Sequence, residues 1–305
     1  MGMGAYWKAT TVALIGDPGA LDVVMTAPSC SKALRSNEPA IAEAHCLVIS
    51  NQWVNPESKH LVIAAPNSFL LALPGQFFHL LCPSAGSDRA FLRRPMSLYS
   101  IDRQRGYVEF LYKVKGVGTR GLATLVKGDI LNVVGPLGTG FDLGQAGDHA
   151  LLAGRGTGIA TLTHLAERIR ARGGRVTAVL SARATELLLS VDRLRSLGVR
   201  VLCVVDEDGS SDIDALRETL QQLHGEDAFS YVATCGSQRL IRLLSSVEGL
   251  RELPGQAAIE QHMACAIGMC FACVHPVRPE PNSMAISYQR VCMEGPVFDL
   301  ARVLV

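Results

Sequence analysis

Hydrophobic and polar residues follow two different patterns along the chain, and the pattern changes near Gly144. Before this point, short apolar segments separated by turn residues predict antiparallel strands. The predicted strands are residues 45–50, 61–64, 77–81, 96–101, 108–114 and 130–134. Short strands at such regular spacing are typical of a small antiparallel barrel. We therefore expect a β-barrel domain in the first half of the chain.

After Gly144, apolar strands alternate with segments of helical length. The predicted strands are residues 149–153, 175–180, 199–205 and 231–234, and the predicted helices are residues 159–171, 185–197, 213–224 and 238–246. Repeated β-α pairs predict a parallel sheet covered by helices. A shorter unit that carries several cysteines follows Pro254-Gly255.

These patterns predict a multidomain α/β and β protein. We divide it into an N-terminal extension of unknown role (1–40), an antiparallel β-barrel domain (41–143), an α/β parallel-sheet domain (144–252) and a small C-terminal domain (253–305). The extension has Gly, Pro and Ser residues but no sustained hydrophobic period, so it receives no structural prediction.

Charge and hydropathy exclude some classes of partner. The chain of 305 residues has 29 basic and 28 acidic side chains, which give a formal net charge of +1. Nucleic acids and anionic membranes are bound by surfaces with a clear basic excess. No apolar run reaches the ~20 residues that span a bilayer, and no signal-peptide pattern opens the chain. We therefore expect a cytoplasmic protein with no nucleic-acid or membrane partner.

The cysteines indicate a cofactor site near the C-terminus. Four of the nine lie close together, at Cys265, Cys270, Cys273 and Cys292. The Cys-x4-Cys-x2-Cys spacing with a distant fourth cysteine matches plant-type 2Fe-2S ligation. A structural zinc site on the same residues is the alternative, because Cys-x2-Cys also occurs in zinc sites. We interpret the flanking His262 and His275 as ordinary histidines.

A glycine-containing turn follows the first strand of the α/β half. Gly154, Gly156 and Gly158 lie where an apolar strand leads into a helix, which suits backbone amides that approach a pyrophosphate. A purely steric role for these glycines is the alternative. Cys235-Gly236 lies at a later strand end, so Cys235 is either close to a nicotinamide or a buried cysteine before a helix.

Candidate flavin ligands occur in order along the barrel half. Arg93-Arg94-Pro95-Met96-Ser97 places a cation and a hydroxyl at the start of a strand, a pairing that suits a flavin edge and a phosphate. Leu111-Tyr112-Lys113 and Gly116-Val117-Gly118-Thr119 follow. Each fragment occurs by chance in many proteins, and their order carries the argument.

Together these motifs, from about His45 to Val303, resemble the electron-transfer subunits of dihydroorotate dehydrogenase, in the ferredoxin-NADP reductase superfamily. The matching segments are residues 92–97, 112–119, 135–141, 154–158, 263–273 and 290–298. The last two segments are the most diagnostic.

The resemblance implies a six-stranded FAD barrel, a nicotinamide-binding α/β domain and a 2Fe-2S domain. It implies FAD binding by Arg94, Pro95, Met96, Ser97, Leu111, Tyr112, Lys113, Gly118 and Thr119, cluster binding by the four cysteines, and a heterotetramer with an FMN-containing catalytic subunit. In such complexes electrons from dihydroorotate oxidation, a step of pyrimidine biosynthesis, pass through the cluster and FAD to NAD. We name no classical catalytic residue, because the cofactors carry the redox chemistry.

Some positions depart from the resemblance. Arg155 and Thr157 interrupt the glycines, Thr161 stands where proline is expected, and Ala266 replaces the usual glycine. Arg183 either meets a 2′-phosphate or begins a solvated helix, so the choice between NAD and NADP stays open. Two alternatives also stay open: a same-fold subunit of a ferredoxin-dependent NADPH or sulfide oxidoreductase, and a zinc-stabilised binding module.

Overall fold

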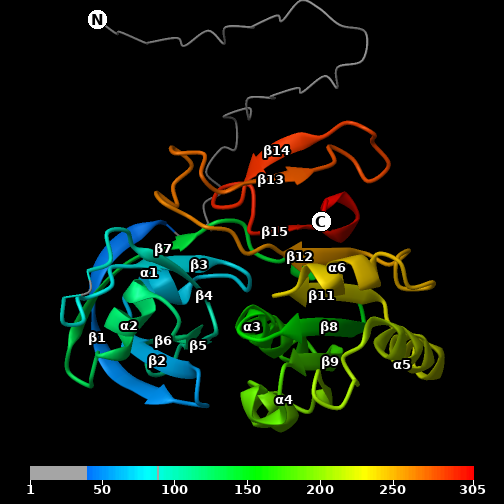
Figure 1. The fold of residues 1–305 in the computed structure, drawn as a ribbon, viewed down its shortest axis with the longest axis horizontal. Coiled ribbons are helices and arrows are strands. Elements are labelled where there is room, and N and C mark those ends of the chain that lie inside the picture. The colour runs from blue at the N-terminus through cyan, green and yellow to red at the C-terminus, as the bar shows by residue number, and fades with distance from the viewer. Residues whose placement is uncertain (1–39, 88) are drawn as a thin grey trace, which may run out of the picture.

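The computed structural model describes residues 40–87 and 89–305. The predicted N-terminal extension, apart from residue 40, and Cys30 lie outside the described residues. Figure 1 shows a barrel body and an α/β body side by side, with the C-terminal segment running across one end of both. The described residues contain no helix that is long and apolar enough to cross a membrane.

The first body is one curled antiparallel sheet, as the sequence predicts. Its strands are β1 (Ala42–Trp53), β2 (Ser58–Ala64), β3 (Phe77–Leu80), β4 (Arg94–Ser97), β5 (Ser100–Asp102), β6 (Tyr107–Lys113) and β7 (Ile130–Leu137). The strand order is β4-β3-β7-β1-β2-β6-β5, and each neighbouring pair is antiparallel. Two short helices, α1 (Asn67–Leu70) and α2 (Val117–Ala123), pack on it.

The predicted strand over residues 96–101 is two strands. β4 and β5 are separated only by Leu98 and Tyr99, yet they lie at opposite edges of the sheet. Both intervening side chains are buried, because the chain turns inward as it passes from one edge to the other. The sheet therefore has seven strands, where the resemblance implies six.

Aromatic side chains fill the barrel. The ring of Phe78 lies 5.0 Å from that of Phe69 and 5.5 Å from that of Phe110, both edge-to-face. The side-chain amide of Asn51 donates to the carbonyl oxygens of Leu122 and Leu125, at 2.8 and 3.0 Å. These bonds attach α2 and the turn after it to β1.

The second body is a six-stranded sheet in the order β10-β9-β8-β11-β12-β15. Its strands are β8 (His149–Arg155), β9 (Arg175–Ala182), β10 (Arg200–Val205), β11 (Tyr231–Cys235), β12 (Gly255–Ala258) and β15 (Val297–Asp299). All neighbours are parallel except β12 and β15. The helices are α3 (Gly158–Arg170), α4 (Val191–Ser196), α5 (Ile213–Glu226) and α6 (Gln238–Leu244), with 3-10 turns η1 (Leu143–Gln145) and η2 (Thr185–Leu187). The predicted alternation of strands and helices is confirmed.

The prediction of a single helix over residues 185–197 is wrong. Residues 185–197 form η2 and α4, and between them the backbone of Ser190 is left-handed with φ of 63°. The Ser190 hydroxyl donates to the Tyr99 hydroxyl at 3.2 Å, and Leu189 is buried against the barrel residues Tyr99 and Leu111. Contact with the other body therefore interrupts a helix that the local pattern favours.

The C-terminal segment is part of both an existing sheet and a new one. β12 and β15 complete the α/β sheet, whereas β13 (Val274–Val277) and β14 (Ser287–Arg290) form a separate hairpin, and the 3-10 turn η3 (Leu300–Arg302) ends the fold. The cysteine loop lies between β12 and β13. It is therefore held between the edge of the α/β sheet and the hairpin.

Candidate cofactor sites between the two bodies

A cavity of about 570 Å³ lies between the barrel and the C-terminal segment. It is lined by Phe77, Pro95, Met96, Ser97, Leu111, Tyr112, Lys113, Lys115, Thr157, Ile259, Glu260, Gln261, His262, Met263 and Pro296. Six of the nine predicted FAD residues are among them, drawn from β4 and β6. A volume of this size, with apolar and polar side chains in nearly equal number, suits a flavin ring, which has an apolar face and a polar edge.

The other three predicted FAD residues do not line this cavity. A Cβ atom at Gly118 would lie 2.7 Å from Arg94 Nε, so the bare backbone of Gly118 leaves room for the Arg94 side chain. The Thr119 hydroxyl accepts hydrogen bonds from the amides of Lys115 and Gly116, at 2.8 and 3.0 Å. Arg94, Gly118 and Thr119 therefore shape the β4 and α2 region beside the cavity.

A second cavity, of about 270 Å³, adjoins the first. Its lining residues are Asn55, Glu57, Ser58, Lys113, Arg155, Gly156, Thr157, Ala182, Arg183, Leu187, Leu189, Gly236 and Glu260. It shares Lys113, Thr157 and Glu260 with the first cavity. It lies at the carboxyl ends of parallel strands β8, β9 and β11, where open α/β sheets bind their ligands.

The predicted glycines have different roles in this second cavity. Gly156 has φ of 55° and lines it, as does Gly236. Gly154 packs under Ile159, and a Cβ atom at Gly158 would lie 2.6 Å from the Gly236 backbone. Gly154 and Gly158 therefore serve the close approach of chain segments. Cys235 is buried behind the cavity, and burial raises the pKa of its thiol.

Two arginines at this site are paired with carboxylates. Arg155 bonds Asp206 through two nitrogens, at 3.1 and 2.6 Å, and also donates to the Ser181 hydroxyl at 2.7 Å. Arg183 reaches Glu57 of the barrel at 2.5 Å, and Glu57 also accepts from Lys113. The Glu57 carboxylate therefore pairs with two cations that line the cavity, Lys113 of the barrel and Arg183 of the α/β body.

The four predicted cluster cysteines come together as two pairs. The thiol of Cys270 contributes to the lowered pKa of Cys265, and the thiol of Cys273 contributes to the raised pKa of Cys292. Among the described residues no three His, Cys, Asp or Glu side chains converge on one metal position. The spacing of the four cysteines, with three in one loop and the fourth in a later segment, suits a 2Fe-2S cluster in which each iron has two protein ligands.

The loop backbone supplies hydrogen-bond donors to this site. The amide of Cys270 donates to Cys265 Sγ at 3.4 Å. Burial opposes ionisation of Cys265, but amide donors from Ile267, Cys270 and Met269 outweigh it and lower the pKa to about 7. Left-handed Ala266 and Phe271, with φ of 58° and 56°, let the loop turn its amides inward. Such a nest of amides suits thiolates and sulfide.

Arg290 fastens the loop to the segment that carries Cys292. It forms an ion pair with Glu294 at 2.5 Å and donates to the Gly268 carbonyl oxygen at 3.1 Å. Its guanidinium also lies 5.3 Å from the centre of the Phe271 ring. The distant fourth cysteine is thereby brought to the other three.

Several site residues were not predicted from the sequence. Asn55 and Glu57 lie in the turn between β1 and β2, and residues 259–262 follow β12. His262, interpreted as an ordinary histidine, lines the larger cavity. The position of residues 259–262 directly before the cysteine motif was the available signal, because the carboxyl end of a parallel strand is a common ligand position.

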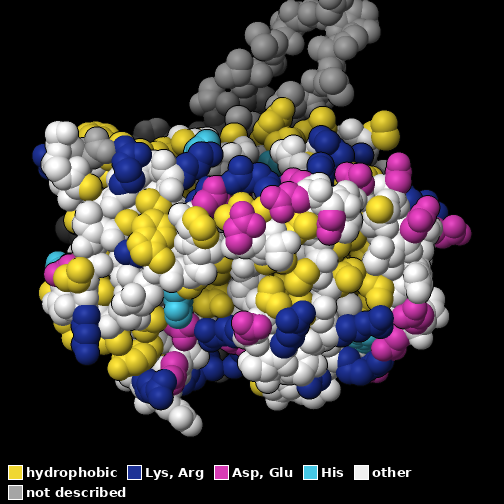
Figure 2. All heavy atoms as spheres, turned by 60° about the horizontal axis from the view of Figure 1, so that its bottom comes forward, with side chains coloured by type: hydrophobic (Ala, Val, Ile, Leu, Met, Phe, Trp, Pro, Cys, Tyr) yellow, Lys and Arg dark blue, Asp and Glu magenta, His cyan; other side chains and the backbone are white. Residues whose placement is uncertain are grey.

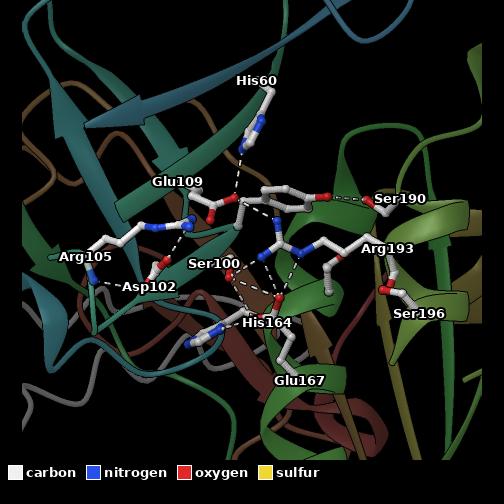
Figure 3. A network of polar contacts seen from close by, with 12 residues as sticks. His60, Ser100, Asp102, Arg105, Glu109, His164, Glu167, Ser190, Arg193 and Ser196 are labelled. Carbon is white, nitrogen blue, oxygen red and sulfur yellow. Dashed lines mark hydrogen bonds and ion pairs between the residues drawn. The ribbon is translucent and has the colours of Figure 1, made fainter. Parts of the chain in front are cut away.

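A buried polar network joins the two bodies beside these cavities (Figure 3). Arg193 of α4 lies at its centre, between Glu109 of β6 and Glu167 of α3.

On the face shown in Figure 2, basic and acidic side chains are interspersed with apolar ones, in keeping with the net charge of +1.

Comparisons with known proteins agree with this geometry. Residues 260–304 match the iron-sulfur cluster binding domain of dihydroorotate dehydrogenase B. The chain is 34% identical over 234 residues to proteins of Bacillus cereus (strain B4264) and Bacillus anthracis (strain CDC 684 / NRRL 3495). Both are named dihydroorotate dehydrogenase B (NAD(+)), electron transfer subunit, and the matches cover 76% of this chain and 86% of each relative.

Solved structures show the same fold. An NADH-dependent reduced ferredoxin-NADP oxidoreductase chain has a TM-score of 0.70 at 24% identity, covering 86% of this chain and 90% of that one. Ferredoxin-NADP+ reductase from Plasmodium falciparum has a TM-score of 0.54 at 13% identity, covering 70% and 96%.

The fold is ferredoxin-NADP reductase-like, with an added C-terminal segment that matches an iron-sulfur cluster binding domain. Within this class, the chain belongs to the family of dihydroorotate dehydrogenase B electron transfer subunits.

Proposed function

We propose that this chain carries electrons between an FMN-containing subunit that oxidises dihydroorotate and NAD, through a 2Fe-2S cluster and FAD. The family supports the overall role, which belongs to pyrimidine biosynthesis. The chain's own part is to bind and align the cofactors, with no contact to the pyrimidine.

The order of the three sites along the molecule carries the proposal. Met263 lines the flavin cavity, and only Ala264 separates it from Cys265 of the cluster loop. On its other side the flavin cavity shares Lys113, Thr157 and Glu260 with the nucleotide cavity. A flavin in the larger cavity therefore lies between the cluster and the coenzyme, as a relay requires.

The residues divide among the three cofactors as follows. Pro95, Met96, Ser97 and residues 111–113 would hold the flavin, with Arg94, Gly118 and Thr119 beside it. Gly156 and Gly236 would face the coenzyme, with Gly154, Gly158 and Cys235 behind them, and the two cysteine pairs would hold the cluster. When bound, the cluster supplies one-electron transfer and the flavin supplies hydride transfer.

The cluster loop also offers a surface for the partner subunit. Ile267, Met269 and Phe271 are 48%, 77% and 55% exposed, and Met293 beside them is 43% exposed. Apolar side chains gathered around a redox centre suit a protein interface. We place the FMN-containing subunit there, in a cytoplasmic heterotetramer, and retain the division into domains at residues 41–143, 144–252 and 253–305.

An anaerobic absorbance spectrum, with iron, zinc and sulfide assayed on the same sample, tests the cofactors. We expect flavin bands near ~450 nm and about two irons and two sulfides per chain. One zinc without flavin or sulfide would overturn the proposal. Mixing the chain with the FMN-containing subunit then tests the substrate, because only this role predicts NAD reduction that depends on dihydroorotate. Activity with ferredoxin or sulfide instead would assign the chain to another oxidoreductase.

A further inference from the structure

One guanidinium joins the flavin-binding barrel to the nucleotide-binding body. Arg193 Nη1 bonds Glu109 at 2.8 Å, Nε bonds Glu167 at 2.9 Å, and Nη2 donates to the Ser100 hydroxyl at 2.6 Å. Glu109 and Ser100 belong to the barrel, whereas Arg193 and Glu167 belong to the α/β body. Figure 3 shows the carboxylates on either side of the guanidinium.

The remaining neighbours of Arg193 complete a closed network. The guanidinium lies 4.8 Å from the centre of the Tyr99 ring, and the Ser100 hydroxyl donates to Glu167 at 2.8 Å. Each carboxylate has a histidine as well: His60 lies 2.8 Å from Glu109, and His164 lies 2.9 Å from Glu167. Within residues 40–87 and 89–305, no oxygen of the two carboxylates therefore depends on Arg193 alone, but Arg193 is the one side chain that bonds both.

The network is partly buried and its charges are unequal. The Glu109 and Glu167 side chains are 12% and 17% exposed, and that of Arg193 is 32% exposed. Two partly buried carboxylates share one fixed positive charge, so removal of Arg193 would leave them facing each other without it. The two bodies would then repel where they now attract.

The elements joined in this way are the ones that hold the cofactors. Glu109 precedes Leu111 on β6, which lines the flavin cavity, and Glu167 lies on α3, which begins at the glycine turn of the nucleotide cavity. A small apolar cluster of Tyr99, Leu111, Ala160 and Leu189 packs between the same elements. A shift of Arg193 would therefore move one cavity relative to the other.

We propose that Arg193 is a positioning residue for hydride transfer, which holds the barrel and the α/β body in the orientation that aligns flavin with nicotinamide. This inference rests on the proposed function. In the assayed direction, a hydride leaves C4 of the nicotinamide with both electrons of its C–H bond and bonds to flavin N5. NADH becomes NAD+, and the flavin takes up the two electrons.

Arg193→Met tests the proposal in the full chain with its cofactors. We expect normal flavin and iron content, faster hydrogen exchange of amides in β5, β6 and α4, and flavin reduction at saturating NADH slowed about tenfold or more, because small misalignments strongly reduce transfer rates. The Kd for NADH should change less than threefold. Arg193→Lys keeps the charge but loses the forked geometry, so its rate of flavin reduction should lie between those of the wild type and Arg193→Met. Arg195→Met, on the exposed face of the same helix, is the matched control.

The outcomes separate the two proposals. A wild-type flavin that NADH does not reduce would overturn the proposed function and this inference with it. In a second outcome, NADH reduces the wild-type flavin while the Arg193→Met variant shows faster amide hydrogen exchange but an unchanged rate of hydride transfer. That result would overturn only this inference. If Arg193→Met does not fold, the same rates measured on Arg193→Lys and Ser100→Ala decide the question, and unchanged rates in both would overturn the inference.

Discussion

Cys265 and Cys292 belong to the same predicted cluster but have opposite electrostatic surroundings. Amide donors lower the pKa of Cys265 to about 7, whereas burial raises the pKa of Cys292 to about 12. The spacing of the cysteines was sufficient to predict which residues come together. It could not predict this difference, because the difference arises from the backbone amides of the left-handed loop around Cys265 and from the burial of Cys292 beside Cys273.

Some of the residues that line the two cavities belong to local sequence motifs, and others do not. Residues 95–97 and 111–113, which line the larger cavity, could be selected as candidates because each set lies in a compact segment of one strand. Glu57 and Gln261 reach the cavities from a hairpin turn and a strand end, and neither has a local motif. Their roles follow only from how the two bodies are placed.

Replacement of one exposed ligand tests the paired arrangement. Cys270→Ala should abolish both irons and both sulfides, because alanine supplies no ligand atom, the two metal ions of a 2Fe-2S cluster share bridging sulfides, and neither is held without the other. Flavin content should stay at about one per chain, since the flavin cavity does not include Cys270. Iron and sulfide assays with the visible spectrum measure this. Cys203→Ser, at a half-buried cysteine on β10, should keep the cluster. Retention of one iron in the Cys270 variant would contradict a shared cluster.

At the scale of elements, periodicity predicts a strand or helix well when its contacts are within its own body. α3 and α5 appear almost where the apolar period places them. The helix predicted over residues 185–197 is broken because Leu189 is buried against barrel residues and Ser190 bonds Tyr99. β4 and β5 separate for a different reason, since their junction passes between the two edges of one sheet.

Helix α2 lies so close to a neighbouring loop that one glycine is obligatory. A Cβ atom at Gly121 would lie 1.9 Å from the carbonyl oxygen of Pro83, and backbone atoms cannot give way cheaply. Gly121→Ala should therefore lower the free energy of unfolding by about 1–3 kcal/mol, as overpacking does. Urea unfolding measures this. Gly225→Ala, in the open on α5, should leave stability equal or up to ~1 kcal/mol higher. Equal stability of the two variants would contradict the contact.

At the scale of the whole molecule, function depends on an interface that no single segment of sequence describes. The barrel and the α/β body each follow from their own hydrophobic pattern. Their relative placement depends on Arg193, on the Glu57 contacts and on the cluster of Tyr99, Leu111, Ala160 and Leu189, which come from segments far apart in the chain. The two cavities adjoin beside these contacts and share three lining residues.

This interface should respond to acid through Glu109. Burial alone would raise the pKa of Glu109, but hydrogen bonds from His60 and Arg193 outweigh it and bring the pKa from 4.5 to about 2. A carboxyl group with a lowered pKa in the folded state stabilises the fold above its unfolded pKa, and this contribution is lost as pH falls toward the folded pKa. This contribution to the free energy of unfolding, of at most about 3 kcal/mol, should therefore be lost between about pH 4.5 and pH 2.

Glu109→Gln measures that contribution directly. The variant should be less stable than the wild type at pH 7. The difference in free energy of unfolding should shrink as pH falls below about 4.5, because the carboxyl group then takes up its proton in the unfolded wild type while it stays ionised in the folded protein. Acid removes cluster sulfide from both proteins alike, so urea unfolding of the two is compared at each pH. Glu186→Gln, at an exposed residue of η2, should show no such trend. A difference between wild type and Glu109→Gln that stays constant from pH 7 to pH 3 would show that Glu109 is not held ionised by Arg193 and His60, and that the two bodies are joined mainly through their apolar contacts.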